Sequence, residues 1–232
     1  MRYDAVVFDL FGTLVYTISP DAYGVMLGEL AAILDVSHDA LSTAWQATIE
    51  ERESGLLGDV SEILATTAAA AGGSPSAAQV SRAGDRWQAI ASKWLVPRDD
   101  TAATVQAFRD AGSKVGLLSN CSAEVPPLWA QGPLAPLFDF TVFSCAVGAM
   151  KPDRGVYDAA CKGLAVLPER CLFVGDGGSR ELTGAAAVGM EAILLRAPGE
   201  DHTWFDTHFR QDALEWPGTI VESLSALVSR GV

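Results

Sequence analysis

Residues 5–14 read AVVFDLFGTL, and no other segment says as much about the architecture. The first four residues form a continuous apolar run, typical of a strand buried on both faces of a parallel sheet. Asp9 follows at the carboxyl end of that strand, where open α/β sheets bind their ligands. Gly12 allows the backbone to turn sharply and to approach a substrate closely. A carboxylate in this place can act as a nucleophile that forms a covalent intermediate.

Composition limits the partners that we expect. The chain has 232 residues, 49% of them hydrophobic, which is enough for one large domain or a domain with an insert. The formal net charge of −13 disfavours nucleic acid and anionic membranes, because both carry dense negative charge. We therefore expect a small-molecule substrate, and an anionic one requires a local cationic pocket. Monomer and homodimer both remain open.

The cysteines and the amino terminus indicate in which cellular compartment we expect the protein. The four cysteines lack the C-x-x-C spacing of metal fingers, so free thiols in a reducing compartment are expected. No signal peptide is predicted, and no apolar run has membrane-spanning length. We expect a soluble, cytoplasmic protein.

A helical insert interrupts the chain early. Residues 20–94 have helical periodicity without strand-like runs, and about four helices are expected. Ser37 and Asp39 are candidate caps for the second helix, which is expected to run through Trp45 and Ile49.

From residue 97 onward strands and helices alternate. The expected strands are residues 5–8, 114–118, 140–145, 171–174 and 192–195. This alternation predicts right-handed βαβ units and an α/β, doubly wound, mainly parallel sheet. A last helix is expected over residues 220–228. The predicted domains are an α/β core, residues 1–15 and 96–232, and a helical insert, residues 16–95.

Chemically different side chains follow the expected strands. They are Asp9, Ser119 with Asn120, Lys151 and Asp176. Each has an ordinary explanation by itself, as a helix cap, a turn or a surface residue. In a parallel sheet, however, these strand ends converge on one edge. Packing alone does not easily explain four such groups in register.

The set fits nucleophilic substitution at phosphorus or carbon. Asp9 would attack, while Ser119 and neighbouring backbone amides would bind the oxygens of the transferred group. Lys151 would compensate the charge of the nucleophile and of an anionic substrate. Asp176, with Glu181 behind it, would bind a hard divalent cation, and Mg²⁺ is the expected cofactor.

Four segments in this order resemble the motifs of the haloacid dehalogenase superfamily. They are residues 9–13 (DLFGT), 118–120 (LSN), 151–153 (KPD) and 174–181 (VGDGGSRE). The insert resembles in position the cap domain of that superfamily's dehalogenases and small-molecule phosphatases. The resemblance covers essentially the whole chain and is specific for the superfamily, but not for a substrate. It implies a covalent intermediate on Asp9 and a metal ligand in the backbone carbonyl of Phe11.

Phe11 is the main departure from the phosphatase pattern. Phosphatases of the superfamily usually carry a general acid there, and such a group contributes roughly 10²–10⁴-fold. Its absence predicts a preference for acidic leaving groups, such as aryl or acyl phosphates. An aromatic residue at this position is similar to the dehalogenases, whose halide leaves without a proton.

The fourth segment favours the phosphatases. Metal-independent dehalogenases usually lack the acidic pair that Asp176 and Glu181 form here. Dehalogenases also place an arginine early in the cap, whereas no Lys or Arg stands between Arg2 and Arg52. We therefore favour a Mg²⁺-dependent phosphatase over a metal-independent 2-haloacid dehalogenase. A binding or regulatory protein of the same fold is the third possibility.

Further residues have two possible roles. Thr13 either ties the catalytic loop by its hydroxyl or starts the next turn. Asn120 either positions the substrate or caps a helix, and Arg180 is either solvated or contacts an anion. Together with Phe11 and Gly12 these are the candidate substrate-binding residues. His202 and His208 are expected to pack at the surface.

Overall fold

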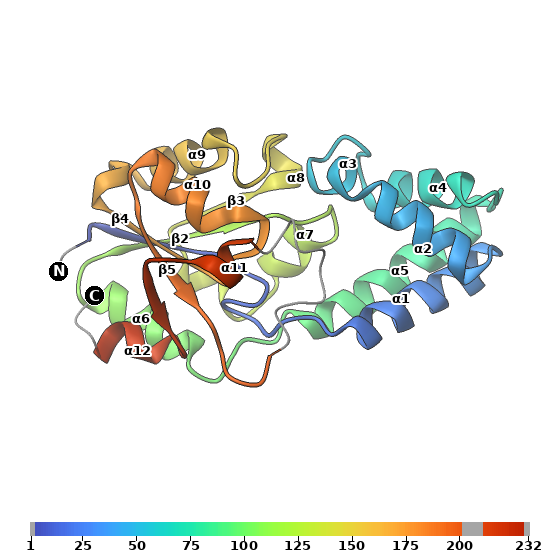
Figure 1. Ribbon diagram of the computed structural model, residues 1–232. Coiled ribbons are helices and arrows are strands. Elements are labelled where there is room, and N and C mark those ends of the chain that lie inside the picture. Colours follow the sequence, from blue (N-terminus) through green and yellow to red (C-terminus); the bar gives the residue numbers. More distant parts are fainter. Residues whose placement is uncertain (1–2, 201–210, 230–232) are drawn as a thin grey trace.

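The computed structural model describes residues 3–200 and 211–229. Its centre is a six-stranded parallel sheet in the order β3-β2-β1-β4-β5-β6. The strands are β1 (Ala5–Phe8), β2 (Lys114–Ser119), β3 (Phe140–Phe143), β4 (Cys171–Gly175), β5 (Glu191–Leu195) and β6 (Thr219–Val221). Figure 1 shows this sheet domain beside a separate group of helices. The α/β class and the parallel sheet predicted from the sequence are confirmed.

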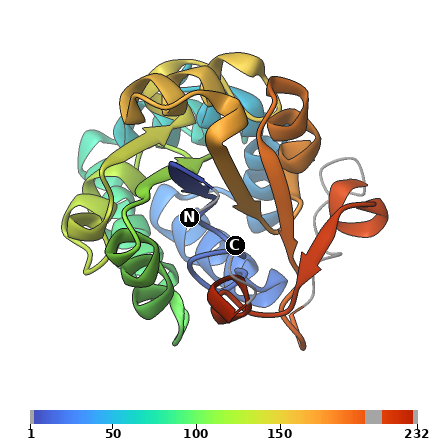
Figure 2. The same ribbon diagram turned by 90° about the vertical axis from the view of Figure 1, so that its left-hand side faces the viewer.

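Helices cover both faces of the sheet (Figure 2). They are α6 (Thr101–Asp110), α7 (Val125–Ala130), α8 (Ser144–Val147), α9 (Arg154–Leu164), α10 (Glu181–Val188), α11 (Gln211–Glu215) and α12 (Ser225–Ser229). Short 3₁₀ turns occupy Ala135–Leu137, Pro168–Arg170 and Gly178–Arg180. None of the described helices combines the length and apolar character that a membrane span requires.

Alternate residues of β1 face the two helical layers. Val6 and Phe8 belong to the hydrophobic cluster that includes residues of α6, α7 and α12. Ala5 and Val7 belong to the cluster on the other face, with residues of α9 and α10. Both clusters are buried, which explains why the strand is apolar throughout.

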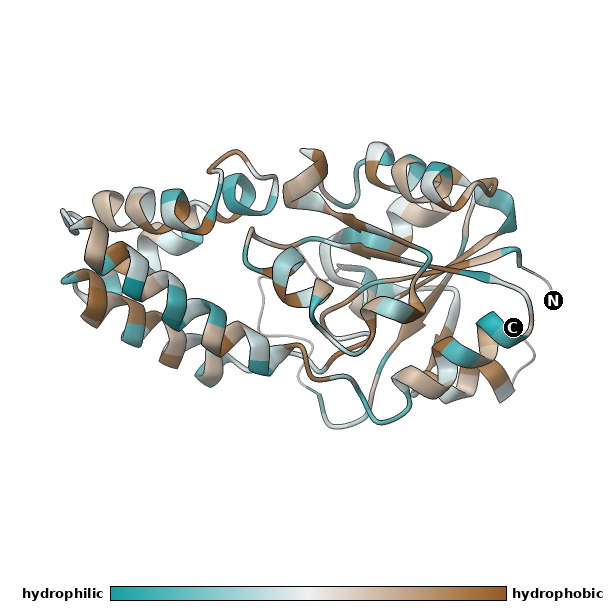
Figure 3. Ribbon diagram, turned by 180° about the vertical axis from the view of Figure 1, so that it is seen from behind, coloured by the Kyte–Doolittle hydropathy of each residue, from teal (hydrophilic) through white to brown (hydrophobic). Residues whose placement is uncertain are grey.

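The insert forms what we call the helical lobe. It consists of α1 (Pro20–Leu34), α2 (His38–Ala47), α3 (Ile49–Glu53), α4 (Val60–Ala70) and α5 (Ala77–Trp94). Of these helices, α1, α2, α4 and α5 enclose a hydrophobic cluster of their own. At its centre Trp45 packs edge to face against Trp87, with ring centroids 4.9 Å apart. In Figure 3 apolar and polar positions alternate along the lobe helices, as expected when one face of each is buried.

The structure differs from the sequence prediction at three element boundaries. The strand expected over residues 140–145 is wrong at its end, because β3 stops at Phe143 and α8 begins at Ser144. The second helix does not continue through Ile49, because the backbone leaves helical geometry at Thr48 (φ −106°, ψ 15°) and α3 begins as a separate turn. The expected helix over residues 220–228 is also wrong at its start. Residues 220 and 221 belong to the β-branched strand β6, and α12 begins only at Ser225.

Candidate active site

Parallel pairing brings the strand ends to one level of the sheet. Phe8 of β1 aligns with Leu117 of β2 and with Val174 of β4. Asp9 follows directly, and its backbone N–H donates to the Val174 carbonyl at 2.9 Å. Asp176 comes immediately after β4. The sheet therefore gathers at one edge the groups that the sequence places at strand ends.

Lys151 is the buried cation of this edge. Its Nζ lies 2.5 Å from Oδ1 of Asp9 and 2.5 Å from Oε2 of Glu181. The second oxygen of Glu181 accepts a hydrogen bond from the Gly177 N–H at 2.9 Å. The Tyr157 hydroxyl donates to the Glu181 carbonyl at 2.9 Å. Lys151 thereby joins carboxylates from two distant segments of the chain.

Asp176 completes a cluster of three buried acids. One carboxylate oxygen from each of Asp9, Asp176 and Glu181 lies within 4.8 Å of the others. Oδ1 of Asp176 accepts from the Gly178 N–H at 2.9 Å, which fixes that side chain. Carboxylate oxygens are the protein ligands that Mg²⁺ prefers. The chemistry and spacing of this donor set fit such an ion.

Burial controls the ionisation of the cluster. It raises the pKa of Asp9 against the attraction of Lys151. Burial also raises the pKa of Glu181 well above its ordinary value, and the charge of Asp9 adds to the increase. For Lys151, burial acts to lower the pKa, but the two neighbouring carboxylates outweigh it and raise the pKa. The lysine therefore stays charged, and Asp9 and Glu181 share its ammonium group.

Gly12 lets the loop after β1 approach Asp176. Its φ is +77°, and a Cβ at this position would lie 2.3 Å from Oδ2 of Asp176. Both the conformation and the space therefore call for glycine. Phe11, one residue earlier, lines the cavity described below and packs against the sheet core.

Asn120 connects the loop after β2 to the segment that carries Lys151. Its Oδ1 accepts from the Lys151 N–H at 2.9 Å, and its Nδ2 donates to the Lys151 carbonyl at 3.3 Å. The Ser119 and Thr13 side chains are fully buried, and neither lines the cavity. The Thr13 hydroxyl has no hydrogen-bond partner among the described residues. It therefore does not tie the loop, whereas the Thr13 N–H does close the turn onto Leu10.

Arg98 supports the loop after β1, a role that was not predicted from the sequence. Its Nε donates to the Thr13 carbonyl at 2.8 Å and its Nη2 to the Gly12 carbonyl at 2.7 Å. The guanidinium also pairs with Glu200, with Nη2 2.8 Å from Oε2. No motif spacing marks Arg98, because its partners are carbonyls that every sequence has.

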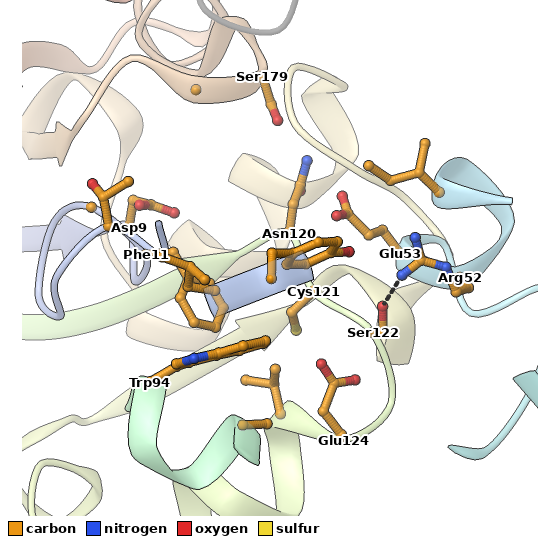
Figure 4. Close-up of a pocket in the computed structure, with 18 of the residues that line it drawn as sticks. Asp9, Phe11, Arg52, Glu53, Trp94, Asn120, Cys121, Ser122, Glu124 and Ser179 are labelled. Carbon is orange, nitrogen blue, oxygen red and sulfur yellow. Dashed lines mark hydrogen bonds between the residues drawn. The ribbon is translucent and has the colours of Figure 1, made fainter. Parts of the chain in front are cut away.

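A cavity of about 180 Å³ lies between the acidic cluster and the helical lobe. Figure 4 shows Asp9 and Phe11 on one side of it and Arg52 and Glu53 of α3 on the other. Trp94, at the end of α5, forms part of the wall between them. The sheet thus supplies one wall of the cavity and the lobe supplies the opposite one.

Arg52 supplies a cation to the lobe wall, where the sequence led us to expect little positive charge. The absence of Lys and Arg before it does not leave the lobe wall without a cation, because Arg52 itself lines the cavity. Its guanidinium lies 4.2 Å from the Trp45 ring centroid and donates to the Trp45 carbonyl at 2.9 Å and to the Ser122 hydroxyl at 3.3 Å. Its Nε is buried without a hydrogen-bond partner in the described part of the chain.

One further candidate, Arg180, does not line this cavity. Arg180 is exposed and lines an adjacent surface groove instead. It caps α10 in a left-handed conformation, with φ 52°. An anion contact by Arg180 stays a prediction. His202 and His208 lie outside the described residues.

A model of the haloacid dehalogenase-like hydrolase family matches residues 3–189. The chain belongs to this family. The matched range contains all four strand-end segments and the whole helical lobe. The resemblance identified from the sequence is therefore confirmed.

Curated relatives match over part of their length. The chain is 32% identical over 107 residues to haloacid dehalogenase-like hydrolase domain-containing protein 3 of Bos taurus, covering 46% of this chain and 42% of that protein. It is 30% identical over 105 residues to the glyceraldehyde 3-phosphate phosphatase of Methanothermobacter thermautotrophicus, covering 44% and 46%. The matched stretch thus spans less than half the length of these relatives.

Solved structures share the fold over nearly the whole chain. The L-2-haloacid dehalogenase of Xanthobacter autotrophicus, with chloropropionic acid covalently bound, has a TM-score of 0.64 at 22% identity and covers 99% of both chains. A haloacid dehalogenase family enzyme of Bacteroides thetaiotaomicron, in complex with magnesium and inorganic phosphate, has a TM-score of 0.66 at 16% identity. It covers 87% of this chain and 98% of its own. At these identities the likeness shows the fold alone.

Proposed function

We propose that this hydrolase is a Mg²⁺-dependent phosphatase that acts on a small phosphorylated metabolite. The observation that carries the proposal is the close approach of three buried carboxylates. One oxygen each from Asp9, Asp176 and Glu181 lies within 4.8 Å of the others, and Lys151 pairs with Asp9 and Glu181. Like charges at this distance repel one another, and a phosphate ester would add more charge of the same sign. A divalent cation among the acids offsets that repulsion.

Names of similar proteins support this assignment. One curated relative is named a glyceraldehyde 3-phosphate phosphatase, and another is named a phosphatase of Mycobacterium tuberculosis. A structural neighbour holds magnesium and inorganic phosphate. We infer the same substrate class, a phosphate ester of a small molecule, for this chain.

Asp9, Asp176 and the Phe11 carbonyl are the groups proposed to hold Mg²⁺, with Glu181 as a further oxygen donor. When bound, the ion would neutralise charge on the nucleophile and on the phosphoryl oxygens. Its affinity should fall at low pH, because the carboxylates must be deprotonated to bind it.

The protein's own residues carry the two chemical steps. The Asp9 carboxylate attacks phosphorus in line with the leaving group, and water then cleaves the aspartyl-phosphate. Lys151 keeps Asp9 ionised and offers positive charge to the phosphoryl oxygens. Asn120 fixes the loop that carries Lys151, and the backbone amides after β2 are proposed to bind the same oxygens. The same role for the Ser119 hydroxyl stays a prediction, because that side chain does not line the cavity.

The helical lobe is proposed to act as a cap. In this proposal residues 16–95 close over a core of residues 1–15 and 96–232, exclude water during the first step and select the substrate. The aromatic rings of Tyr23 and Trp94 stack with centroids 6.0 Å apart and both line the cavity. A small, partly apolar substrate body would fit this wall.

Dehalogenation is the second candidate, favoured by two features of the cavity. Phe11 is aromatic, and Arg52 places a cation where a substrate carboxylate or halide could bind. However, a metal-independent reaction gives no role to three buried carboxylates held within 4.8 Å of one another. Phosphate chemistry therefore accounts for more of the site.

A substrate panel separates the possibilities. Phosphomonoesters and 2-haloacids are each incubated with Mg²⁺ and with chelator, using wild type and Asp176→Asn. We expect phosphate release that needs Mg²⁺ and that Asp176→Asn weakens by raising the Mg²⁺ concentration required. Halide release insensitive to chelator selects the dehalogenase. No turnover of either class selects a binding or regulatory protein.

A further inference from the structure

Glu53 is the carboxylic acid that α3 brings to the lobe wall of the cavity. Its backbone is held against the sheet domain by Ser144, whose hydroxyl donates to the Glu53 carbonyl at 2.6 Å. The same hydroxyl oxygen accepts from the Cys121 N–H at 2.9 Å, in the loop after β2. The position of Glu53 is therefore coupled to the catalytic edge and not only to the lobe.

Close backbone packing fixes the same segment. Gly55, two residues later, has φ +78°, and a Cβ there would lie 2.1 Å from the Cys145 carbonyl oxygen. The chain after α3 thus lies directly against α8, which begins at Ser144. Arg52 adds a side-chain link from the lobe to Ser122. These contacts hold Glu53 at a defined place over the site.

The Glu53 carboxyl points into the cavity. In Figure 4 it lies across Asn120 from Asp9, so the two acids face the same space from opposite walls. No donor in the described part of the chain hydrogen-bonds this carboxyl. It is only partly buried, and its oxygens are available to a bound molecule.

The charges around Glu53 come from several elements. Arg52 on its own helix, Tyr23 on α1 and Lys151 at the catalytic edge face it. Glu124, Cys121 and Cys145 do so from the sheet domain. Burial raises the pKa of Glu53, although Arg52 and Lys151 oppose the shift. The protonated form is therefore more populated near neutral pH than for a solvated glutamate.

We propose that Glu53 donates the proton to the leaving-group oxygen, the role that Phe11 cannot fill. This inference rests on the proposed phosphatase function. In-line attack by Asp9 directs the leaving group away from the sheet wall, and hence towards the lobe wall where Glu53 lies. A carboxylic acid placed there meets the atom that develops negative charge.

Protons and bonds balance over the two steps. As the Asp9 oxygen bonds to phosphorus, the bond from phosphorus to the leaving oxygen breaks, and that oxygen takes the Glu53 proton. The Glu53 carboxylate then accepts a proton from the water that attacks the aspartyl-phosphate. The Asp9 oxygen–phosphorus bond breaks, which releases inorganic phosphate and restores Asp9 as carboxylate and Glu53 as acid.

The proposal changes an expectation drawn from Phe11. If Glu53 supplies the proton, wild type should hydrolyse alkyl phosphates as well as aryl phosphates. Only a variant that lacks the Glu53 carboxyl should then prefer acidic leaving groups. The leaving-group dependence of the reaction therefore reports directly on this side chain.

The test compares Glu53→Gln with Glu50→Gln, a control on the exposed side of the same helix. Both variants and wild type are assayed with Mg²⁺ on glycerol 2-phosphate and on 4-nitrophenyl phosphate. For Glu53→Gln we expect kcat/KM to fall roughly 10²–10⁴-fold on the alkyl ester but less than about 10-fold on the aryl ester. Glu53→Asp should recover part of the alkyl activity, and Glu50→Gln should match wild type.

Three results would overturn the proposal. Equal losses on both esters would show that Glu53 supports the fold or the cavity rather than proton transfer. A change confined to KM would make it a binding residue. Wild type that hydrolyses only the aryl ester would show that no acid acts, with the phosphatase function intact. Absence of phosphate release from both esters by wild type refutes the proposed function itself.

Discussion

The two walls of the cavity both carry acids with raised pKa values, yet they hold them differently. On the sheet wall, Asp9 and Glu181 share a buried ammonium only 2.5 Å from each. On the lobe wall, the guanidinium of Arg52 bonds mainly to the Trp45 carbonyl and to Ser122 instead. We therefore expect the sheet wall to keep Asp9 ionised for attack and the lobe wall to favour an acid that retains its proton.

The walls also differ in what positions their residues. Strand register fixes the sheet wall. Asp9 and Asp176 directly follow strands, and Lys151 is held by a hydrogen bond to Asn120, which directly follows β2. The lobe wall depends on contacts such as those of Ser144 with Glu53 and of Ser122 with Arg52. The nucleophile and its charge partners are thus placed on rigid strands, whereas the proposed proton donor and the lobe residues that line the cavity depend on contacts between the two parts of the molecule.

The largest expected effect tests the sheet wall. Asp9→Asn removes the nucleophile but keeps its shape, so activity should fall by at least roughly 10³-fold. The substitution also removes a buried charge, so the thermal midpoint at pH 8 should be unchanged or higher. Initial rates and thermal unfolding measure the two properties. Asp110→Asn, at an exposed helix end, is the control.

Loss of activity together with a lower midpoint for Asp9→Asn would contradict this account. It would mean that Asp9 stabilises the fold through Lys151 and that its burial has a structural purpose. Retained activity would remove Asp9 from the chemistry altogether.

Lys151→Met is expected to destabilise the protein by about 3–5 kcal/mol at pH 8, because it leaves Asp9 and Glu181 buried without their cation. Burial then raises the pKa of both carboxyls further above their unfolded values. The protons they take up stabilise the fold as pH falls, so the destabilisation should be smaller at pH 5 than at pH 8. Urea unfolding at the two pH values measures the difference.

Lys162→Met provides the matched control for the lysine substitution. Lys162 is exposed in the last turn of α9, so its loss should change stability by less than about 1 kcal/mol at either pH. A similar small effect for Lys151→Met would show that the ammonium does not compensate the buried charges of Asp9 and Glu181 in the way proposed.

Most of the sheet wall could be predicted from the sequence. A strand whose residues are all buried precedes Asp9, and another precedes Asp176. Because the two strands are parallel, their carboxyl ends, and hence the two acids, lie at the same edge of the sheet. The structure places them within one cluster together with Glu181. The short strand β6 was missed because Thr219–Val221 is too brief for a periodicity to show.

The lobe wall could not be predicted in the same way. Arg52 and Glu53 lie on a five-residue helix with no motif spacing, and they reach the cavity only because α3 packs against α8. Arg98 was missed for a related reason, since it binds backbone carbonyls. Such contacts depend on tertiary packing, which leaves no local signature in the chain.

The smallest expected effect concerns Glu124, the second acid that faces Arg52. Its carboxyl is buried, its Oε2 has no hydrogen-bond partner among the described residues, and burial raises its pKa to about 7. Between its unfolded pKa near 4.5 and this value, the folded state binds the extra proton. The free energy of unfolding should therefore decrease as pH rises through that window and stay low above it.

Glu124→Gln removes this titration. At pH 8 the variant should be more stable than wild type by up to about 3 kcal/mol, and near pH 4.5 the two should be about equal. Urea unfolding at half-unit steps between pH 4.5 and 8 measures the profile, with exposed Glu222→Gln as the control. A variant less stable than wild type at pH 8 would show that Glu124 is ionised and paired with Arg52. The lobe-facing acids would then resemble those of the sheet wall, and the contrast between the walls would fail.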